Sequence, residues 1–106
     1  MTEAELQAAI VETAELCGWL VFHDNDSRRN TPGFPDLVLV KPPRIVLLEL
    51  KSANGRIRPE QRIWMDQLAE CDIVASAIIR PEHLDQTIEY LTKGTNHEPV
   101  RPSETP

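Results

Sequence analysis

The sequence predicts a single α/β domain in which helices flank a mixed central sheet. Three segments repeat apolar residues at helical spacing, and four short β-rich runs lie among them in the order α-β-β-β-α-β-α. A chain of 106 residues is the size of one domain with one hydrophobic core. Its 41% hydrophobic and 26% charged residues are typical of a soluble protein, which we expect to be cytoplasmic and without a membrane partner. Cys17 and Cys71 lack metal-ligand spacing, and we expect both to be reduced core thiols.

The first predicted helix begins at Glu3. Thr2 and Glu5, three residues apart, form the capping-box pattern that precedes a helix. Gly18 supplies a stop at the other end. Between these signals, six positions recur at helical spacing and predict the buried side: Leu6, Ala9, Ile10, Thr13, Ala14 and Cys17.

The later elements follow from runs bounded by turn-forming residues. Apolar, β-rich runs predict strands at residues 19–23, 37–40, 45–50 and 73–79. Pro59 suits the first position of a helix, which an apolar stripe continues to residue 71. A last helix spans residues 81–91 and is closed by Gly94. Three prolines from Thr95 onward indicate a loose tail, so the predicted domain covers residues 1–94 and the tail residues 95–106.

Two acidic residues fall at or inside runs that otherwise predict buried strands. If the second and third runs fold into a hairpin about Pro42 and Pro43, Asp36 lies opposite Glu49 on one face of the sheet. Two prolines cannot form the tight primed turn of a short hairpin, so we expect a wider turn that keeps this pairing. Lys51 lies two residues beyond Glu49 and therefore projects from the same face.

These three side chains suggest a metal-dependent reaction. Two carboxylates about 5 Å apart repel each other, and a cation bound between them removes the repulsion. Ligands that are all oxygen favour Mg²⁺ or Mn²⁺ over zinc, and an adjacent ammonium can orient water or stabilise charge on a phosphate. The alternative is a pair of surface carboxylates with a lysine on a wet sheet face. Four apolar positions on the same face favour the metal site instead: Val38, Val40, Ile45 and Leu47.

At these positions the chain resembles a known family. Gly33-Phe34-Pro35-Asp36-Leu37, followed by Glu49-Leu50-Lys51, resembles the PD-(D/E)XK nuclease motif, and more narrowly its VRR-NUC branch in the small stand-alone form of phages and bacteria. The resemblance extends over about residues 3–91. Its further matches are Gly18-Trp19, His23, the loop Asp26-Ser27-Arg28-Arg29, Gly55, Pro59-Glu60-Gln61 and Arg80-Pro81.

The resemblance implies a restriction-endonuclease-like core and a Holliday-junction-resolvase-like endonuclease. Such an enzyme hydrolyses DNA phosphodiesters with Mg²⁺ or Mn²⁺, with branched DNA as the expected substrate. A four-way junction has two symmetric scissile strands, which a homodimer would match. A catalytically weak DNA-structure-binding module with the same fold is the alternative, and a metal-independent interaction domain is a second.

The resemblance also assigns roles to residues. Asp36 and Glu49 become metal ligands together with the backbone carbonyl of Leu50, and Lys51 becomes the catalytic lysine. The family glutamine maps to Gln61, which shares the inward stripe of its helix with Trp64, Met65 and Leu68. A buried amide that caps a backbone group is an equally open interpretation of Gln61.

The first helix offers one more ligand by the same resemblance. Many family members place a glutamate there near the metal, which maps to Glu3, with Gln7 as the other candidate. A first-turn glutamate also simply favours the helix dipole, so Glu3 keeps a structural interpretation.

Charge is unevenly distributed in this acidic chain. Residues 27–62 hold eight Lys or Arg against three Asp or Glu, a balance of +5 within a net charge of −6. A basic middle segment is typical of a phosphate-binding face, although a scattered solvated surface gives the same count. Five residues of this segment are the predicted DNA contacts: Ser27, Arg28, Arg29, Arg56 and Arg58.

Overall fold

The computed structural model describes residues 1–23 and 31–93. Its elements are α1 (Glu3–Leu16), β1 (Leu20–His23), β2 (Leu37–Lys41), β3 (Arg44–Leu50), α2 (Pro59–Ala69), β4 (Ala75–Ile79), the 3₁₀ turn η1 (Pro81–His83) and α3 (Leu84–Lys93). The predicted order is therefore confirmed, with a short 3₁₀ turn opening the last helix. The predicted stop at Gly94 and the tail from Thr95 lie outside the described residues.

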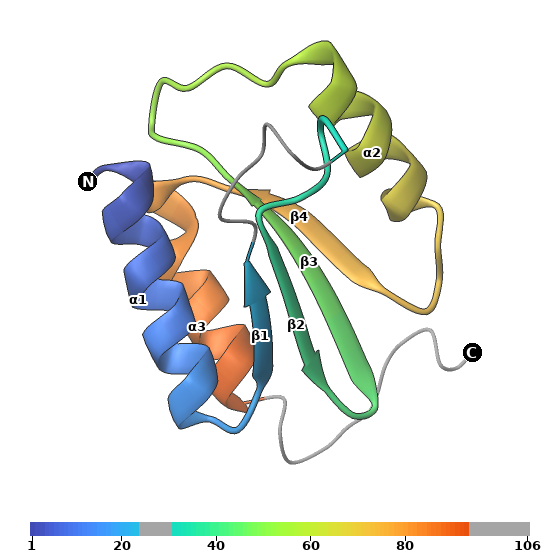
Figure 1. Cartoon of the computed structure of the whole chain (residues 1–106). Coiled ribbons are helices and arrows are strands. Elements are labelled where there is room, and N and C mark those ends of the chain that lie inside the picture. Colours follow the sequence, from blue (N-terminus) through green and yellow to red (C-terminus); the bar gives the residue numbers. More distant parts are fainter. Residues whose placement is uncertain (24–30, 94–106) are drawn as a thin grey trace.

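The four strands form one mixed sheet in the order β1-β2-β3-β4. The first three strands are antiparallel neighbours, whereas β4 is parallel to β3 because the chain returns through α2. In Figure 1, α1 and α3 lie side by side on one face of the sheet and α2 lies on the other. The main core fills the space between the sheet and the α1–α3 pair. Its fully buried members include Leu6, Ile10, Leu37, Leu39 and Leu91.

Both ends of α1 follow local rules. The capping box is present: the Glu5 backbone N–H donates to Thr2 Oγ1 at 3.0 Å, and the Thr2 N–H donates to Glu5 Oε1 at 2.8 Å. At the other end, Gly18 has a φ of +90°, which a glycine adopts without a Cβ penalty. Lys41 Nζ donates to the Cys17 carbonyl oxygen there, so β2 holds the end of the helix.

The hairpin has the register that the sequence predicts. Leu37 pairs with Leu48 and Val38 with Leu47, which places the preceding Asp36 opposite Glu49. The expectation of a wider turn is wrong, because Lys41 pairs with Arg44 across only two residues. The two residues of the turn, Pro42 and Pro43, are joined by a cis peptide bond. The prediction of a wider turn considered only the primed turns, which do not contain such a bond.

Strand β3 is buried on both faces from Val46 onward. One face meets the main core, and the other carries Leu47, which is buried on the side of Met65 from α2. Helix α2 packs against the neighbouring strand β4 (Figure 1). Any polar side chain near the end of β3 is therefore enclosed on both sides, which is the environment of Glu49.

The two cysteines lie nearer the surface than the predicted core thiols would. Both cysteines are free, but Cys71 is exposed beyond the end of α2, and Cys17 is only half-buried at the end of α1. The prediction of core thiols is therefore wrong for Cys71, because α2 ends at Ala69, two residues earlier. No helix in the described ranges is both long and apolar enough to cross a membrane.

Candidate active site

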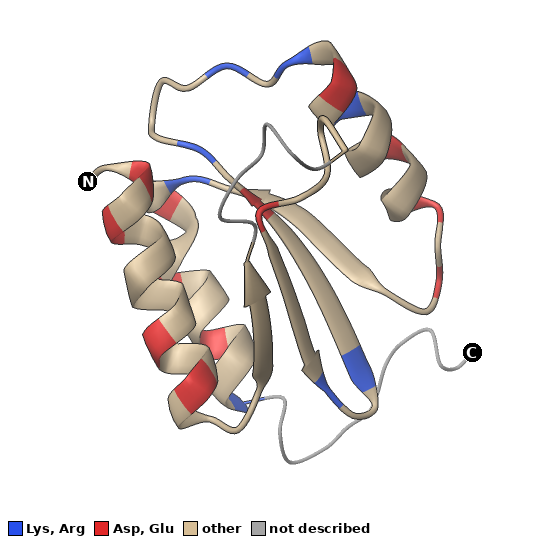
Figure 2. Ribbon diagram, viewed as in Figure 1, with Lys and Arg blue, Asp and Glu red and all other residues tan. Residues whose placement is uncertain are grey.

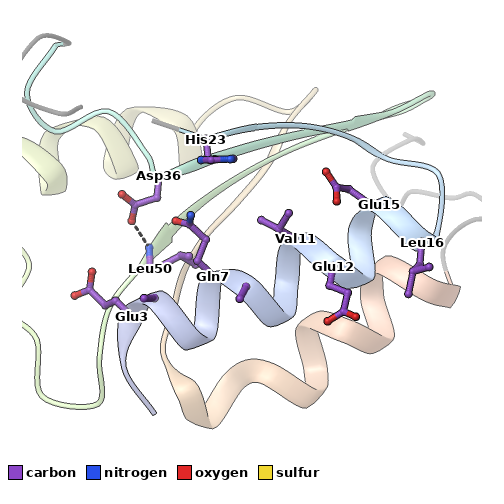
Figure 3. A pocket seen from close by; sticks show the side chains of 11 residues that line it. Glu3, Gln7, Val11, Glu12, Glu15, Leu16, His23, Asp36 and Leu50 are labelled. Carbon is purple, nitrogen blue, oxygen red and sulfur yellow. Dashed lines mark hydrogen bonds between the residues drawn. The ribbon is translucent and has the colours of Figure 1, made fainter. Parts of the chain in front are cut away.

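Asp36 lies where the β2–β3 ladder ends. Its Oδ2 accepts a hydrogen bond of 2.9 Å from the Leu50 backbone N–H (Figure 3). The next N–H, that of Lys51, points the other way and donates to the Ile79 carbonyl of β4 at 3.0 Å. The Asp36 carboxylate thus occupies the position where a further residue of β2 would have accepted from β3. It is held at the strand end by the backbone of the motif itself.

Glu49 is buried to 1% exposure between the sheet and α2. Its Oε2 accepts a 2.7 Å hydrogen bond from Gln61 Nε2, and its Oε1 has no hydrogen-bond partner among the described residues. Burial, followed by the negative charge of Asp36, raises the pKa of Glu49 from 4.5 to about 7. The positive charge of Lys51 acts in the opposite direction, and Glu3 adds to the increase. Groups from α1, from α2, from the residue before β2 and from the loop after β3 therefore all act on this one carboxyl group.

Gln61 caps a backbone group, as one of the two open interpretations expected, and it also contacts Glu49. Its Oε1 accepts the Arg58 backbone N–H at 2.9 Å and so caps the start of α2, while its Nε2 holds Glu49. The side chain is 6% exposed, as the inward stripe predicts. Because the same amide satisfies a helix end and a carboxylate, the position of α2 and that of Glu49 are coupled.

The residues before Asp36 fix it against α2. Gly33 has a φ of +90°, and a Cβ there would lie 2.4 Å from the Glu60 carbonyl oxygen, so only glycine allows this approach. Phe34 packs edge-on against Trp64, with ring centroids 5.1 Å apart. The Gly-Phe-Pro-Asp segment therefore packs against α2 directly before β2 begins.

A cavity of about 770 Å³ opens beside Asp36 on the α1 side of the sheet (Figure 3). Glu3, Gln7, His23 and Leu50 also line it. Both first-helix candidates, Glu3 and Gln7, thus line the same cavity as Asp36. The buried Glu49 and Lys51 are not among the residues that line this cavity.

The donor set fits a hard divalent cation. An unpaired, buried carboxylate oxygen is costly unless a cation or donor satisfies it, and Glu49 Oε1 is such an atom. Within residues 1–23 and 31–93, no three His, Cys, Asp or Glu side chains gather as a metal cluster. Two carboxylates and one backbone carbonyl, the ligands that the family resemblance implies, remain consistent with that finding, because Mg²⁺ keeps several waters and needs few protein ligands.

Lys51 is 9% exposed and precedes a turn at residues 52–55. Arg80 reaches this turn from the end of β4, with Nη1 donating to the carbonyl oxygen of Ser52 at 2.8 Å and of Gly55 at 2.9 Å. In the sequence, Arg80 stands out only as part of the family resemblance. No local pattern could have revealed its contacts with this turn, since its acceptors lie 28 and 25 residues earlier in the chain.

The basic middle segment does not form one surface. Lys41 is bound to the end of α1, and the Arg44 guanidinium packs on Trp19 and Tyr90 at 4.4 and 5.0 Å from the ring centroids. Both lie at the hairpin end of the sheet, the blue segments far from the Asp36 end in Figure 2. For these two cations the phosphate-face interpretation is therefore wrong, because Lys41 is hydrogen-bonded to the end of α1 and Arg44 packs on two aromatic rings.

Other basic residues remain close to the site. Arg56 and Arg58 are exposed in the loop that follows Lys51. Arg58 pairs with Glu60 at 3.4 Å, and its positive charge opposes part of the rise in the pKa of Glu49. The predicted contacts Ser27, Arg28 and Arg29 lie outside the described residues.

Comparison with known proteins agrees with this geometry. The family model of the VRR-NUC domain matches residues 2–78. A solved structure described as a VRR_NUC domain aligns with a TM-score of 0.66 at 23% sequence identity, over 83% of this chain and 95% of that chain, and shows the same restriction-endonuclease-like fold. No curated protein matches the chain. Since the family model covers well over half of the sequence, this chain belongs to the VRR-NUC family of nuclease-type domains.

Proposed function

We propose that this chain is a divalent-metal-dependent endonuclease that hydrolyses DNA phosphodiesters. The observation that carries the proposal is the Glu49 carboxylate, buried beside Asp36 with one oxygen unpaired in the described structure. A protein that only recognised DNA shape would gain nothing from burying one carboxyl group beside the partly exposed carboxylate of another. Membership of a nuclease-type family supports the same conclusion.

Asp36, Glu49 and the carbonyl of Leu50 are the groups that would hold Mg²⁺ or Mn²⁺. The Leu50 N–H donates to Asp36, and in an extended strand a residue's carbonyl lies on the same side as its N–H, so we expect this carbonyl to be directed toward Asp36. When bound, the cation would neutralise charge on the attacked phosphate. Glu3 and Gln7 line the adjoining cavity, where either could bind water near the cation.

Lys51 and Gln61 have different tasks in this proposal. The Lys51 ammonium would donate a hydrogen bond to a phosphate oxygen or orient the attacking water, and its burial strengthens that interaction. Gln61 would keep one Glu49 oxygen occupied, so that the other stays directed at the cation. Arg56 and Arg58 would contact the DNA backbone beside this centre.

The proposal extends to branched DNA as substrate and to a homodimer as the active form. Family resemblance supports the substrate, and the two symmetric strands of a four-way junction support a two-fold assembly. Sedimentation should then give a complex whose mass exceeds that of the junction DNA alone by twice 12.0 kDa. A monomer on cleaved junctions would remove the dimer from the proposal and leave the chemistry.

A cleavage panel tests the activity directly. End-labelled four-way junction, flap, duplex and single-stranded DNA are incubated with Mg²⁺, Mn²⁺ or EDTA. We expect cutting with either metal and none in EDTA, and a loss of at least about 100-fold in kcat for Glu49→Gln and Lys51→Met. Glu89→Gln is the matched control, since Glu89 pairs with Lys93 on α3, away from the site.

The panel also separates the alternatives. Junction binding without cleavage in any metal would indicate a DNA-binding module and would reject the enzymatic proposal. Equal cleavage by wild-type protein and Lys51→Met would point to a contaminating nuclease and reject it as well.

A further inference from the structure

The turn after Lys51 packs on the side chain of that lysine. The Gly55 N–H donates to the Ser52 carbonyl oxygen at 3.1 Å and closes residues 52–55 into a turn. A Cβ on Gly55 would lie 3.3 Å from Lys51 Cδ and 3.0 Å from Ser52 Oγ. The turn therefore lies directly against the aliphatic part of Lys51.

One arginine nitrogen holds this turn from outside. Arg80 Nη1 donates to the carbonyl oxygens of Ser52 at 2.8 Å, Gly55 at 2.9 Å and Ala53 at 3.5 Å. All three acceptors are backbone groups of a single turn, and charge-assisted hydrogen bonds of this kind are stronger than neutral ones. The guanidinium replaces the helix or strand partners that these carbonyls would otherwise need.

The backbone of Arg80 is also tied to Lys51. The Lys51 N–H donates to the carbonyl oxygen of Ile79, the residue before Arg80, at 3.0 Å. The Arg80 N–H in turn donates to His83 Nδ1 at 2.9 Å, which fixes the start of η1. Lys51 is thus held at its backbone by Ile79, the last residue of β4, and at its side chain by a turn that the next residue, Arg80, holds.

We propose that Arg80 is a positioning residue for Lys51, acting through the turn at residues 52–55. This inference rests on the proposed function, in which Lys51 serves the reaction. Displacement of a reacting group by about 1 Å can cost 100-fold in rate, so a lysine with rotatable bonds benefits from an external constraint. Arg80 itself need not touch DNA in this scheme, because its Nη1 is engaged by the turn.

The experiment compares Arg80→Met, Arg80→Lys and the control Arg62→Met. Arg62 is an exposed arginine that pairs with Asp66 on α2 at 3.5 Å. Steady-state kcat and KM are measured on the best DNA substrate, and Mn²⁺ affinity is measured by calorimetry. The ε-carbon NMR signal of Lys51 is followed in parallel; the chain has only three lysines, and Lys51→Arg assigns the signal.

For Arg80→Met we expect kcat to fall about 10- to 100-fold, with KM and Mn²⁺ affinity unchanged. The Lys51 signal should move toward the position of a solvated lysine. Arg80→Lys should recover part of both effects, because an ammonium can still donate to two or three carbonyls. Arg62→Met should match wild-type protein in every measurement.

Gly55→Ala tests the same link without altering Arg80. Its φ is not in the left-handed region, so the added methyl acts through its contact with Lys51 and Ser52. We expect the Lys51 signal to shift and kcat to fall with unchanged KM. This variant also decides the matter if Arg80→Met does not fold.

An unshifted Lys51 signal in Arg80→Met and Gly55→Ala would overturn the inference, even if kcat fell, because Arg80 would then act on DNA directly. A rise in KM with unchanged kcat would overturn it in the same way. If wild-type protein cuts no DNA, the proposed function fails, whereas the NMR comparison still shows whether Arg80 positions Lys51.

Discussion

At the scale of single residues, the unusual feature is a glutamate held by a neutral amide and not by a cation. Gln61 satisfies one oxygen of Glu49, and Lys51 lowers the pKa of this carboxyl less than burial and Asp36 raise it. The chain therefore holds Glu49 in an environment that favours its protonated form. That environment is destabilising at neutral pH unless a divalent cation compensates.

This makes the stability of the metal-free protein depend on pH. The pKa of Glu49 is about 7 in the folded chain, whereas an ordinary glutamate, as in the unfolded chain, has a pKa of 4.5. The folded state therefore binds the proton more tightly. The contribution of Glu49 to stability is full below pH 4.5 and is lost as the pH rises to about 7. The loss amounts to about 3 kcal/mol, since one pKa unit corresponds to about 1.4 kcal/mol. Urea unfolding in EDTA from pH 4.5 to 8 measures it.

Glu49→Gln is the control for this pH dependence. The glutamine amide oxygen can still accept from Gln61, so the variant should lack this part of the slope while keeping the fold. Saturating Mn²⁺ should restore stability to the wild-type protein at pH 8 and not to the variant. Identical pH slopes for the two proteins in EDTA would show that Glu49 is not protonated in the fold.

Sequence reasoning succeeded for residues whose partners are set locally. Asp36 and Glu49 could be paired because a hairpin about two prolines has one symmetric register. Arg44 and Lys41 could not be placed, since their partners come from α1 and α3, which return to the hairpin only in the folded chain. The sequence shows that these two positions carry positive charge. Tertiary packing decides whether such a side chain can contact phosphate or is held against other parts of the protein.

At the scale of elements, α2 and the segment before β2 determine the geometry of the site together. The helix begins at Pro59 as predicted, but nothing in its own sequence shows that Gly33 touches its first turn. Strand boundaries were predicted to within two residues, since apolar runs mark them. The approach of a loop to a helix end depends on tertiary packing and carries no periodic signal.

A pair of glycine variants tests this approach. Gly18 and Gly33 both have a φ of +90°, but an added Cβ lies 3.7 Å from Lys41 Nζ at Gly18 and 2.4 Å from the Glu60 carbonyl oxygen at Gly33. We expect Gly18→Ala to cost about 1–2 kcal/mol from backbone conformation alone. Gly33→Ala should cost above about 3 kcal/mol, because the clash adds to the same conformational cost. Urea unfolding of both variants gives the comparison, and equal costs would contradict the close approach.

At the scale of the whole molecule, charge is separated between two sides of the site. Helix α1 carries acidic side chains along its length and no basic residue in its last turn, whereas cations gather in the loop from Lys51 to Arg58 (Figure 2). DNA should therefore approach from the loop side, with the acidic helix turned away.

This direction of approach predicts a salt effect. Arg56→Ala should weaken DNA binding similarly for all sequences and reduce the slope of log affinity against log salt by about 1. Lys93→Ala is the control, because Lys93 is occupied by Glu89 at 2.7 Å on α3. Binding titrations at several salt concentrations in Ca²⁺, a cation chosen to limit cutting, provide the measurement. An unchanged slope for Arg56→Ala would place the DNA elsewhere.

The connection between β2 and β3 consists of two proline residues and has no spare residue that could absorb an insertion. Lys41 and Arg44 pair directly on either side of it, so one inserted residue has to slide one strand past the other or form a bulge. A slide would send Asp36 and Glu49 to opposite faces, at the far end of the sheet from the insertion. The length of the hairpin tip, more than its chemistry, therefore decides whether Asp36 and Glu49 can lie opposite each other.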